Sequence, residues 1–350
     1  MNHQFLISIC IPTFNRAFYL NNSLNQISSE LKNISKGLVE ICIFDNCSSD
    51  LTEEVVAKAM QNGLSLRYIR NDKNIGSDEN IAQCFNQALG KYILIMGDDD
   101  LFIDGALIEL IKYLQSTEYG LVFLKPFGFD NNFRMELPYS IYRTTEYTNS
   151  NDFLVKVGCY ISLISACIIN KSLLTEIDAR QFCGNNLVQV HLCVMAVLRA
   201  NKNLYIHHYQ VAIKRNNSSG YDHSRIFVKN LLNIFDSFVG KGLTKKDIQK
   251  IERDLLLFYL PYYILRILFI KNCDLQEIEK NYNDRYDGKW FYIFGIRIAF
   301  YLPRFLAIAW VAFLTLVGRI LCGDFIRGLY FLKNYIYRIN FFLYNNIKFF

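Results

Sequence analysis

The chain has 350 residues, of which 52% are hydrophobic and 20% are charged. This much apolar material supports a sizeable folded core and excludes global disorder. Length alone allows either one large domain or two. The formal net charge is +6; residues 289–350 hold eight Lys or Arg and one acidic residue (+7), so residues 1–288 sum to −1.

Residues 1–16 contain an apolar run with no basic segment before it and no small-residue cleavage site after it. This pattern predicts a first strand and not a signal peptide. The ten cysteines include no CxxC pair, and several lie inside apolar runs. They are typical of reduced core residues in a cytosolic protein, and not of a disulfide framework or a zinc site.

Short apolar runs alternate with helical segments over the first hundred residues. We expect strands at residues 6–11, 39–44, 66–70 and 91–96, and helices at 18–31, 52–60 and within 74–90. Such alternation favours an α/β fold with a parallel sheet and right-handed crossovers. Further strands are expected at residues 121–129 and 161–170.

Polar residues follow three of these strands. They are Thr13, Asn15 and Arg16 after the first strand, which Pro12 ends, Asp45 after the second, and Asp98, Asp99 and Asp100 after the fourth. Ligands of open α/β sheets bind outside the carboxyl ends of the strands, so we expect these side chains to line one edge. Taken singly, Asp45 could simply turn the chain, and Asn74 and Gly76 fit a turn equally well.

The three consecutive aspartates at 98–100 repel one another unless water or a cation neutralises their charge. One interpretation is a solvated loop after a buried strand. The other is a divalent-metal site, because hard carboxylate oxygens suit Mg²⁺ or Mn²⁺, which commonly bridge to substrate phosphates. No GxGxxG or GxxxxGK[ST] motif occurs, so dinucleotide and P-loop binding are unsupported.

The motifs IPTFNR, FDNCSSDLT, NIGSDENIAQCFNQALGKYI and GDDD, in this order, resemble those of the GT-A glycosyltransferases of family 2. The resemblance is close over residues 5–105 and extends more weakly to about residue 215. The GDDD variant and the segment after it are most similar to abequosyltransferase-type enzymes of O-antigen assembly. The resemblance implies a GT-A fold, which is Rossmann-like, with a mostly parallel sheet and flanking helices.

The same resemblance implies roles for individual residues. Asp45 would face the base of a nucleotide-sugar donor, and Asp98 would lie at the ribose. Asp100, with Asp98 as a second candidate ligand, would hold Mg²⁺ or Mn²⁺ at the diphosphate. The remaining implied donor-binding residues are Pro12, Thr13, Asn15, Arg16, Asn74, Gly76 and Asp99.

The general base of an inverting transferase has no obvious candidate here. The family usually supplies an acidic residue about ninety residues beyond the metal motif, but residues 179–221 contain no Asp or Glu. His191 is the candidate replacement, since imidazole is a competent base near neutral pH. Its helical stripe with Leu187 and Val194 fits a core histidine equally well. Gln189 cannot act as a base, because an amide is not basic. His207, His208 and His223 are the other candidates, one of which would complete the metal shell or meet a phosphate.

The C-terminal third combines short apolar runs with regularly placed Arg and Lys. Residues 255–270 are interrupted by Pro261 and Arg266, and residues 305–318 are uncharged over too few positions for a convincing transmembrane helix. The 19 aromatic residues within 289–350 favour helices lying at anionic membrane lipid. The alternatives are an ordinary helical core and a dimer interface. Nucleic-acid binding is not expected, because apolar residues dilute the basic ones.

These patterns predict three regions: a GT-A domain at 1–215, a helical extension at 216–288, and basic, aromatic, membrane-associating helices at 289–350. The predicted function is metal-dependent, inverting transfer of a sugar from a nucleotide-sugar donor to a lipid-linked acceptor, on undecaprenyl diphosphate. Such an enzyme would serve O-antigen or surface polysaccharide synthesis at the cytoplasmic face of a bacterial inner membrane. The alternative is a catalytically inactive, membrane-associated binding or scaffold protein. Residues 129–147 are expected to shape the acceptor side.

Overall fold

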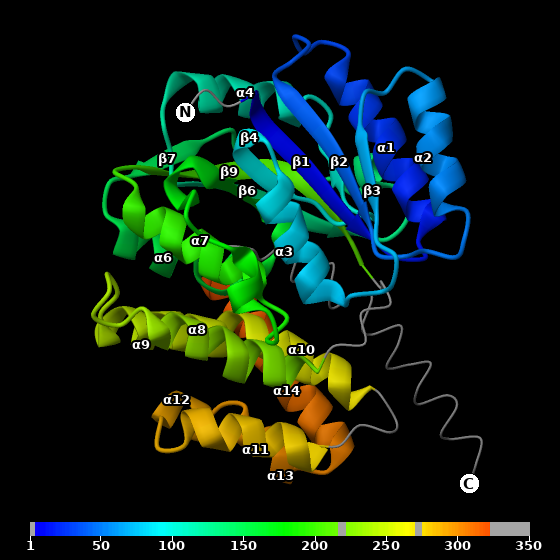
Figure 1. Cartoon of the computed structure of the whole chain (residues 1–350). Helices are drawn as coiled ribbons and strands as arrows, with labels where there is room; N and C mark the ends of the chain where they lie inside the picture. The colour runs from blue at the N-terminus through cyan, green and yellow to red at the C-terminus, as the bar shows by residue number, and fades with distance from the viewer. Residues whose placement is uncertain (1–3, 216–221, 270–274, 323–350) are drawn as a thin grey trace, which may run out of the picture. The chain divides into compact units, whose positions relative to one another are not determined.

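The structure, a computed structural model, describes residues 4–215, 222–269 and 275–322. Two compact units divide the chain: Met1–Tyr221 with Gly240–Gly242, and Asp222–Val239 with Leu243–Phe350. The first unit holds the β-sheet, whereas the described part of the second consists of helices (Figure 1).

The first four strands form a parallel half-sheet, as the sequence predicts. They are β1 (Phe5–Thr13), β2 (Val39–Asp45), β3 (Arg67–Arg70) and β4 (Gly90–Ile95), in the order β3-β2-β1-β4. The helices between them are α1 (Ala17–Leu31), α2 (Thr52–Gln61) and α3 (Ser77–Gln87). The predicted alternation is confirmed, and it has a simple cause: continuous apolar runs suit strands that helices cover on both faces.

Beyond β4 the sheet is mixed, whereas the sequence predicts a mostly parallel one. Its order continues β4-β8-β6-β9-β5, and β7 pairs with β9 off this path. The added strands are β5 (Leu101–Phe102), β6 (Leu121–Phe129), β7 (Thr144–Tyr147), β8 (Cys167–Asn170) and β9 (Asn203–Lys214). The β6–β9 pair is parallel, but β8 runs antiparallel to both of its neighbours. The length and apolar pattern of a sequence segment predict a strand but not its direction. An antiparallel strand also needs no crossover helix that would mark it in the sequence.

The strand predicted at residues 161–170 is wrong over its first six residues. Two short 3-10 helices, η1 (Gly158–Ser162) and η2 (Ile164–Ala166), precede β8. The hydroxyl of Ser162 donates to the carbonyl of Cys159 at 2.7 Å, a local bond that competes with strand pairing. This helical detour carries Ser165 to the carboxyl end of β4, where its hydroxyl accepts from the N–H of Gly97.

Helices cover the sheet in two layers (Figure 1). On one face α1 packs against α2 and α4 (Ala106–Ser116). On the other face α7 (Val188–Arg199) packs against α3 and α6 (Ser150–Val157). The main core lies between the sheet and the first layer. Its members include Ile7, Ile9, Ile11, Leu20, Leu24, Ile41, Ile43, Leu94, Leu107 and Leu110, all buried.

The second unit is built from helical segments. They are η5 (Ser224–Asn230), α8 (Leu231–Ser237), α9 (Lys245–Asp254), η6 (Leu255–Tyr259), α10 (Leu260–Leu268), α11 (Leu275–Tyr286), α12 (Trp290–Ile293), α13 (Arg297–Tyr301) and α14 (Arg304–Leu321). Three buried tyrosines, Tyr282, Tyr286 and Tyr292, pack with ring centroids 5.9–6.2 Å apart. Beside them Arg285 and Lys289 both pair with the buried carboxylate of Glu252.

Within the described residues, α14 is the one helix whose length and composition would let it cross a membrane. Its 18 residues have a mean hydropathy of 1.8, and 28% of them are buried inside the protein. The sequence pattern favours helices at the membrane surface, and the length of α14 adds a spanning arrangement to the options. Residues 323–350 of the predicted membrane-associating region lie outside the described residues.

Candidate functional site

The ends of the parallel strands bring the predicted site residues to one edge of the sheet. Thr13, the last residue of β1, is in register with Asp45, the last residue of β2. Asp45 is in turn in register with Arg70 at the end of β3. On the other side of β1, β4 ends at Ile95, just before the aspartate triplet. Pro12 lies within β1, opposite Phe44 of β2.

The three aspartates are buried, which excludes the solvated loop that the sequence also allows. Asp98 accepts a hydrogen bond of 2.8 Å from the hydroxyl of Thr13. The guanidinium of Arg16 lies 2.9 Å from Asp98 Oδ1 and also pairs with Asp99. Burial raises the pKa of Asp98 to about 7, against the opposing effect of Arg16 and with a further contribution from Asp99. The guanidinium of Arg16 thus faces a cluster of carboxyl groups that are largely shielded from water.

Asp100 is held from two remote parts of the chain. Its Oδ2 accepts a hydrogen bond from the hydroxyl of Ser165, and its Oδ1 accepts one of 3.0 Å from the backbone N–H of Lys214. Burial, together with the charge of Asp99, raises the pKa of Asp100 to about 8. A Cβ at position 97 would lie 2.9 Å from Asp100 Oδ2, so Gly97 leaves room for this carboxylate.

The donor set fits a divalent cation that a substrate completes. Among the described residues, no group of three or more His, Cys, Asp or Glu side chains is arranged to hold a metal ion alone. Mg²⁺ and Mn²⁺, however, commonly take one or two carboxylates and fill the remaining positions with substrate phosphates and water. In the described part of the chain, two of the three buried carboxyl groups pair with the guanidinium of Arg16, and an added positive charge suits such a cluster.

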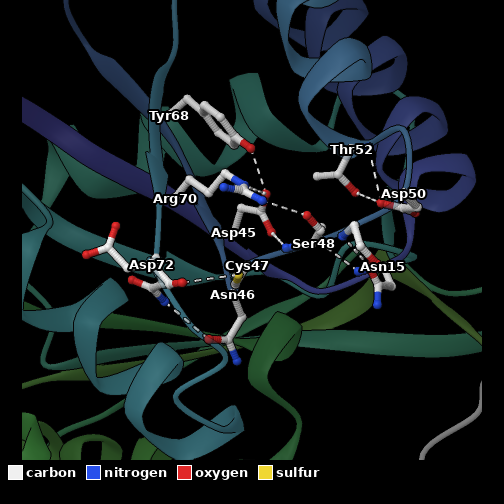
Figure 2. A network of polar contacts seen from close by, with 12 residues as sticks. Asn15, Asp45, Asn46, Cys47, Ser48, Asp50, Thr52, Tyr68, Arg70 and Asp72 are labelled. Atoms are coloured by element: carbon white, nitrogen blue, oxygen red, sulfur yellow. Dashed lines mark hydrogen bonds and ion pairs between the residues drawn. The ribbon is translucent and has the colours of Figure 1, made fainter.

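Asp45 lies beneath the site and not on its surface. Its carboxylate is fully buried and accepts hydrogen bonds from the Ser48 N–H at 2.9 Å and from the Tyr68 hydroxyl at 2.6 Å. Figure 2 shows Tyr68 and Arg70 reaching it from β3, with Arg70 Nε 3.7 Å from Asp45 Oδ2. The Arg70 side chain is 43% exposed, so it is the more accessible polar group of this pair. Sequence reasoning missed both residues, because a strand rich in Arg and Tyr carries no motif.

Asn15, Asn74 and Gly76 shape the loops at this edge. Asn15 adopts φ 53°, a left-handed conformation that asparagine tolerates. Its side chain accepts from the N–H of Ser49 at 2.7 Å, which ties the end of β1 to the loop after β2. Asn46 donates to Asn74 Oδ1 at 2.9 Å and to the carbonyl of Gly76 at 3.2 Å. These bonds give Asn74 and Gly76 a loop-ordering part in the structure.

His191 lies in the first turn of α7, in a segment tied to α3. Its ring stacks on Phe182 with centroids 4.5 Å apart, and Nε2 lies 3.2 Å from the side-chain amide of Asn185. Burial lowers the pKa of His191 to about 4, so the imidazole is neutral at pH 7. Asp78 Oδ2 accepts the backbone N–H groups of residues 184–186 at 2.7–3.0 Å. This bond set joins the His191 segment to the helix that follows Gly76.

The other predicted residues of this region have partners elsewhere. His208 Nε2 lies 2.9 Å from Glu109 of α4, and His207 Nε2 lies 2.9 Å from the hydroxyl of Thr145. His223 belongs to the second unit, where it packs against Tyr263. Gln189 is buried and donates to the carbonyl of Ser162 at 2.9 Å. These contacts give them structural partners outside the aspartate cluster.

Comparison with known proteins finds similar sequences for the part of the chain that forms the parallel strands and the aspartate triplet. Residues 8–177 match the profile of Glycosyl transferase family 2. Abequosyltransferase RfbV of Salmonella typhimurium is 42% identical over 113 residues, which cover 32% of this chain and 33% of the relative. The GalNAc(5)-diNAcBac-PP-undecaprenol beta-1,3-glucosyltransferase of Campylobacter jejuni is 30% identical over 108 residues, or 30% of this chain and 33% of that one. The matches thus span about a third of these relatives.

The solved structures extend the likeness of fold to most of the chain. The S. aureus TarS fragment 1–349 in complex with UDP-GlcNAc has a TM-score of 0.60 at 17% identity, covering 92% of this chain and 89% of that one. The mannosyltransferase PcManGT of Pyrobaculum calidifontis, in complex with GDP-Man and Mn²⁺, has a TM-score of 0.50 at 14% identity, covering 94% and 88%. The GT-A fold class is therefore confirmed. The likeness to glycosyl transferase family 2 itself rests on residues 8–177, just under half of the chain.

Proposed function

We propose that this protein is a metal-dependent, inverting glycosyltransferase that moves a sugar from a nucleotide-sugar donor onto a lipid-linked acceptor. The observation that carries the proposal is the buried triplet Asp98–Asp100, held at the carboxyl edge of a family 2 sheet with Arg16 as its counter-ion. A carboxyl cluster so placed is costly to the fold unless a cationic ligand compensates it. A Mg²⁺ or Mn²⁺ ion, bound together with the diphosphate of a nucleotide, would supply that positive charge.

The chain's own residues divide the work of donor binding. Asp100 and Asp98 would hold the cation, which when bound supplies Lewis-acid stabilisation of the departing diphosphate. Arg16, already at this cluster, would add a positive charge beside the same oxygens. Arg70 is the accessible polar side chain next to Asp45 and would meet the base. Asp45 would act through Tyr68 and Arg70, since its own carboxylate is covered.

In this proposal His191 takes the proton from the acceptor hydroxyl. The imidazole is neutral at pH 7, which leaves a ring nitrogen free of its second proton, as a general base requires. Its low pKa makes it a weak base, so most of the catalytic effect would come from leaving-group stabilisation. The bonds of Asp78 to residues 184–186 support this role only by tying the His191 segment to α3, the helix that follows Gly76.

Membrane association is the second part of the proposal. Trp290, Phe294 and Phe305 of the second unit are each at least 66% exposed, an unusual placement for large aromatic side chains. Basic residues alternate with them along the chain, as in helices that lie among anionic headgroups. A lipid-linked acceptor, such as the undecaprenyl diphosphate carrier named for the Campylobacter jejuni relative, would be met at the cytoplasmic face of a bacterial inner membrane. The relatives also favour a place in O-antigen or surface polysaccharide synthesis.

A catalytically inactive binding protein is the second candidate. It is favoured by the absence of Asp and Glu from residues 179–221 and by the weak basicity of His191. It would keep the donor site but lack turnover. Hydrolysis or transfer of a bound nucleotide sugar separates the two candidates.

The first experiment is thermal unfolding of the detergent-purified protein with UDP, CDP, GDP and dTDP, each with Mn²⁺ or EDTA. Asp100→Asn is the test variant, and Asp104→Asn is the matched control, because Asp104 is exposed and pairs with Arg134. We expect one nucleotide to raise Tm more with Mn²⁺ than with EDTA in wild type and in Asp104→Asn, and Asp100→Asn to lose this Mn²⁺-dependent gain. The absence of a shift with all four nucleotides would refute the transferase proposal.

A further inference from the structure

We propose that Ser165 is a positioning residue that fixes the carboxylate of Asp100 for cation binding. The inference rests on the proposed function of Asp100 and adds a residue that neither the motifs nor the family resemblance indicates. Ser165 lies in η2, in a segment that sequence patterns assign to a strand. It is 65 positions away from Asp100 along the chain.

The hydrogen bonds of Ser165 define its direction. A hydroxyl has one hydrogen to donate and lone pairs that accept. The Gly97 N–H donates to Ser165 Oγ at 2.9 Å, and the Ser165 hydroxyl donates to Asp100 Oδ2. The serine therefore links the first and last residues of the GDDD turn. Because its only hydrogen goes to Asp100, the Ser165 hydroxyl acts as a donor to this carboxyl oxygen and as an acceptor for Gly97.

A second anchor makes the orientation of Asp100 definite. Asp100 Oδ1 accepts from the backbone N–H of Lys214 at 3.0 Å, while Oδ2 accepts from Ser165. One bond to each oxygen prevents rotation of the carboxylate about its Cβ–Cγ bond. Each oxygen retains lone-pair capacity for a further ligand. Of the two anchors only Ser165 is a side chain, so it is the one that a substitution can remove.

Burial makes the contact matter energetically. Ser165 is 1% exposed and Asp100 is 6% exposed, so water cannot replace a lost hydroxyl without rearrangement. Groups that orient a metal ligand typically change metal affinity by about 10- to 100-fold when they are removed. Removing the Ser165 hydroxyl also leaves the part-buried N–H of Gly97 without the acceptor that it has in this bond, and an unsatisfied donor in such a place is costly.

The same segment supplies a matched control. Ser162 is also buried and also forms a hydroxyl hydrogen bond, but its bond goes to the carbonyl of Cys159 at 2.7 Å. Ser162→Ala therefore removes a buried hydroxyl three residues away without touching Asp100. Ser165→Thr keeps the hydroxyl at position 165 and serves as the conservative rescue variant.

The test is Mn²⁺ titration, followed by the electron paramagnetic resonance signal of free Mn²⁺, with a saturating nucleoside diphosphate from the set UDP, CDP, GDP and dTDP. Nucleotide binding in EDTA is measured in parallel on the same full-length proteins. We expect Ser165→Ala to weaken Mn²⁺ binding about 10- to 100-fold and to leave nucleotide affinity in EDTA within about threefold of wild type. Ser162→Ala should match wild type, and Ser165→Thr should recover most of the lost affinity.

Three results would overturn the inference. Mn²⁺ affinity of Ser165→Ala within about threefold of wild type, beside a loss in Asp100→Asn, would refute the role of Ser165 alone. An equal loss of nucleotide affinity in EDTA would show that Ser165 only supports the fold. Absence of nucleotide-dependent Mn²⁺ binding by wild type would refute the proposed function and this inference together.

Discussion

The hydroxyl of Thr13 donates a hydrogen bond of 2.8 Å to Asp98 across 85 positions of sequence, joining the end of β1 to the turn after β4. Thr13→Val removes the donor and keeps the shape of the side chain. We expect donor-nucleotide affinity to fall about tenfold, because a hydrogen bond to a charged group contributes about 1.5–3 kcal/mol. Thr13→Ser, which retains the hydroxyl, should stay near wild type in isothermal titration calorimetry. Equal affinities for the Val and Ser variants would contradict this role.

Asp100→Asn should stabilise the protein in the absence of metal. The folded pKa of Asp100, about 8, lies above its unfolded value, so the folded state favours the protonated form. The stability that this preference gives is present at pH 4 and is lost as the pH rises through 8. We therefore expect Asp100→Asn to exceed wild type in Tm by several degrees at pH 8.5 in EDTA, and by less at pH 5. Unchanged Tm at pH 8.5 would mean that the carboxylate is not penalised by burial.

With nucleotide and Mn²⁺ present, wild type should have a higher Tm than Asp100→Asn. The ligand stabilises only the form that binds it, so wild type gains more Tm under saturating ligand than the variant does. Asp104→Asn, at an exposed position, should follow wild type in both conditions.

His191→Gln should reduce sugar transfer about 10²-fold while leaving donor binding unchanged. This is the lower end of what general-base catalysis is usually worth, because the low pKa of His191 makes it a weak base. The pH profile provides the more specific check. Because burial lowers the pKa of His191 to about 4, the acid limb of kcat should have its midpoint near pH 4 and not near 6.5. Activity of His191→Gln equal to wild type would assign the base to another group.

Asp78 lies outside the aspartate cluster, but its contacts predict that removing its side chain will destabilise the fold. Its Oδ2 accepts three backbone N–H groups from residues 184–186. We expect Asp78→Ala to lower the free energy of unfolding by about 2 kcal/mol and to reduce transfer more than donor binding. Asp72→Ala, at an exposed position six residues earlier, should change neither. The measurements are urea unfolding and steady-state kinetics.

The aromatic side chains of the second unit predict lipid binding that depends on charge. Flotation with phosphatidylglycerol-containing vesicles should recover the wild-type protein, and recovery should fall with phosphatidylcholine alone or in high salt. Combined Trp290→Ser and Phe294→Ser should reduce recovery severalfold. Phe18→Ser is the control, because Phe18 of the first unit is 74% exposed and equally apolar. Equal losses in both variants would indicate nonspecific adsorption.

Sequence reasoning succeeded where one local pattern determines one structure. The apolar runs of β1 to β4 and the polar residues after them are such patterns, and α7 follows from its helical stripe. It failed where residues far apart in the sequence determine the conformation or burial of a side chain. Nothing near Ser165 reveals that Gly97 and Asp100 will meet it, and its apolar neighbours read as a strand. Likewise the burial of Asp45 depends on Tyr68, which belongs to another strand.

The bond between the Lys214 N–H and Asp100 spans 114 positions, and β9, which carries it, begins after the family match ends at residue 177. During synthesis, the aspartates therefore leave the ribosome long before the strand that completes their surroundings. Contacts of such sequence separation form late and slowly. The nascent chain would pass through a stage in which three like charges lack their final anchors. Truncation anywhere before residue 214 should accordingly yield a protein that needs chaperones and binds no cation.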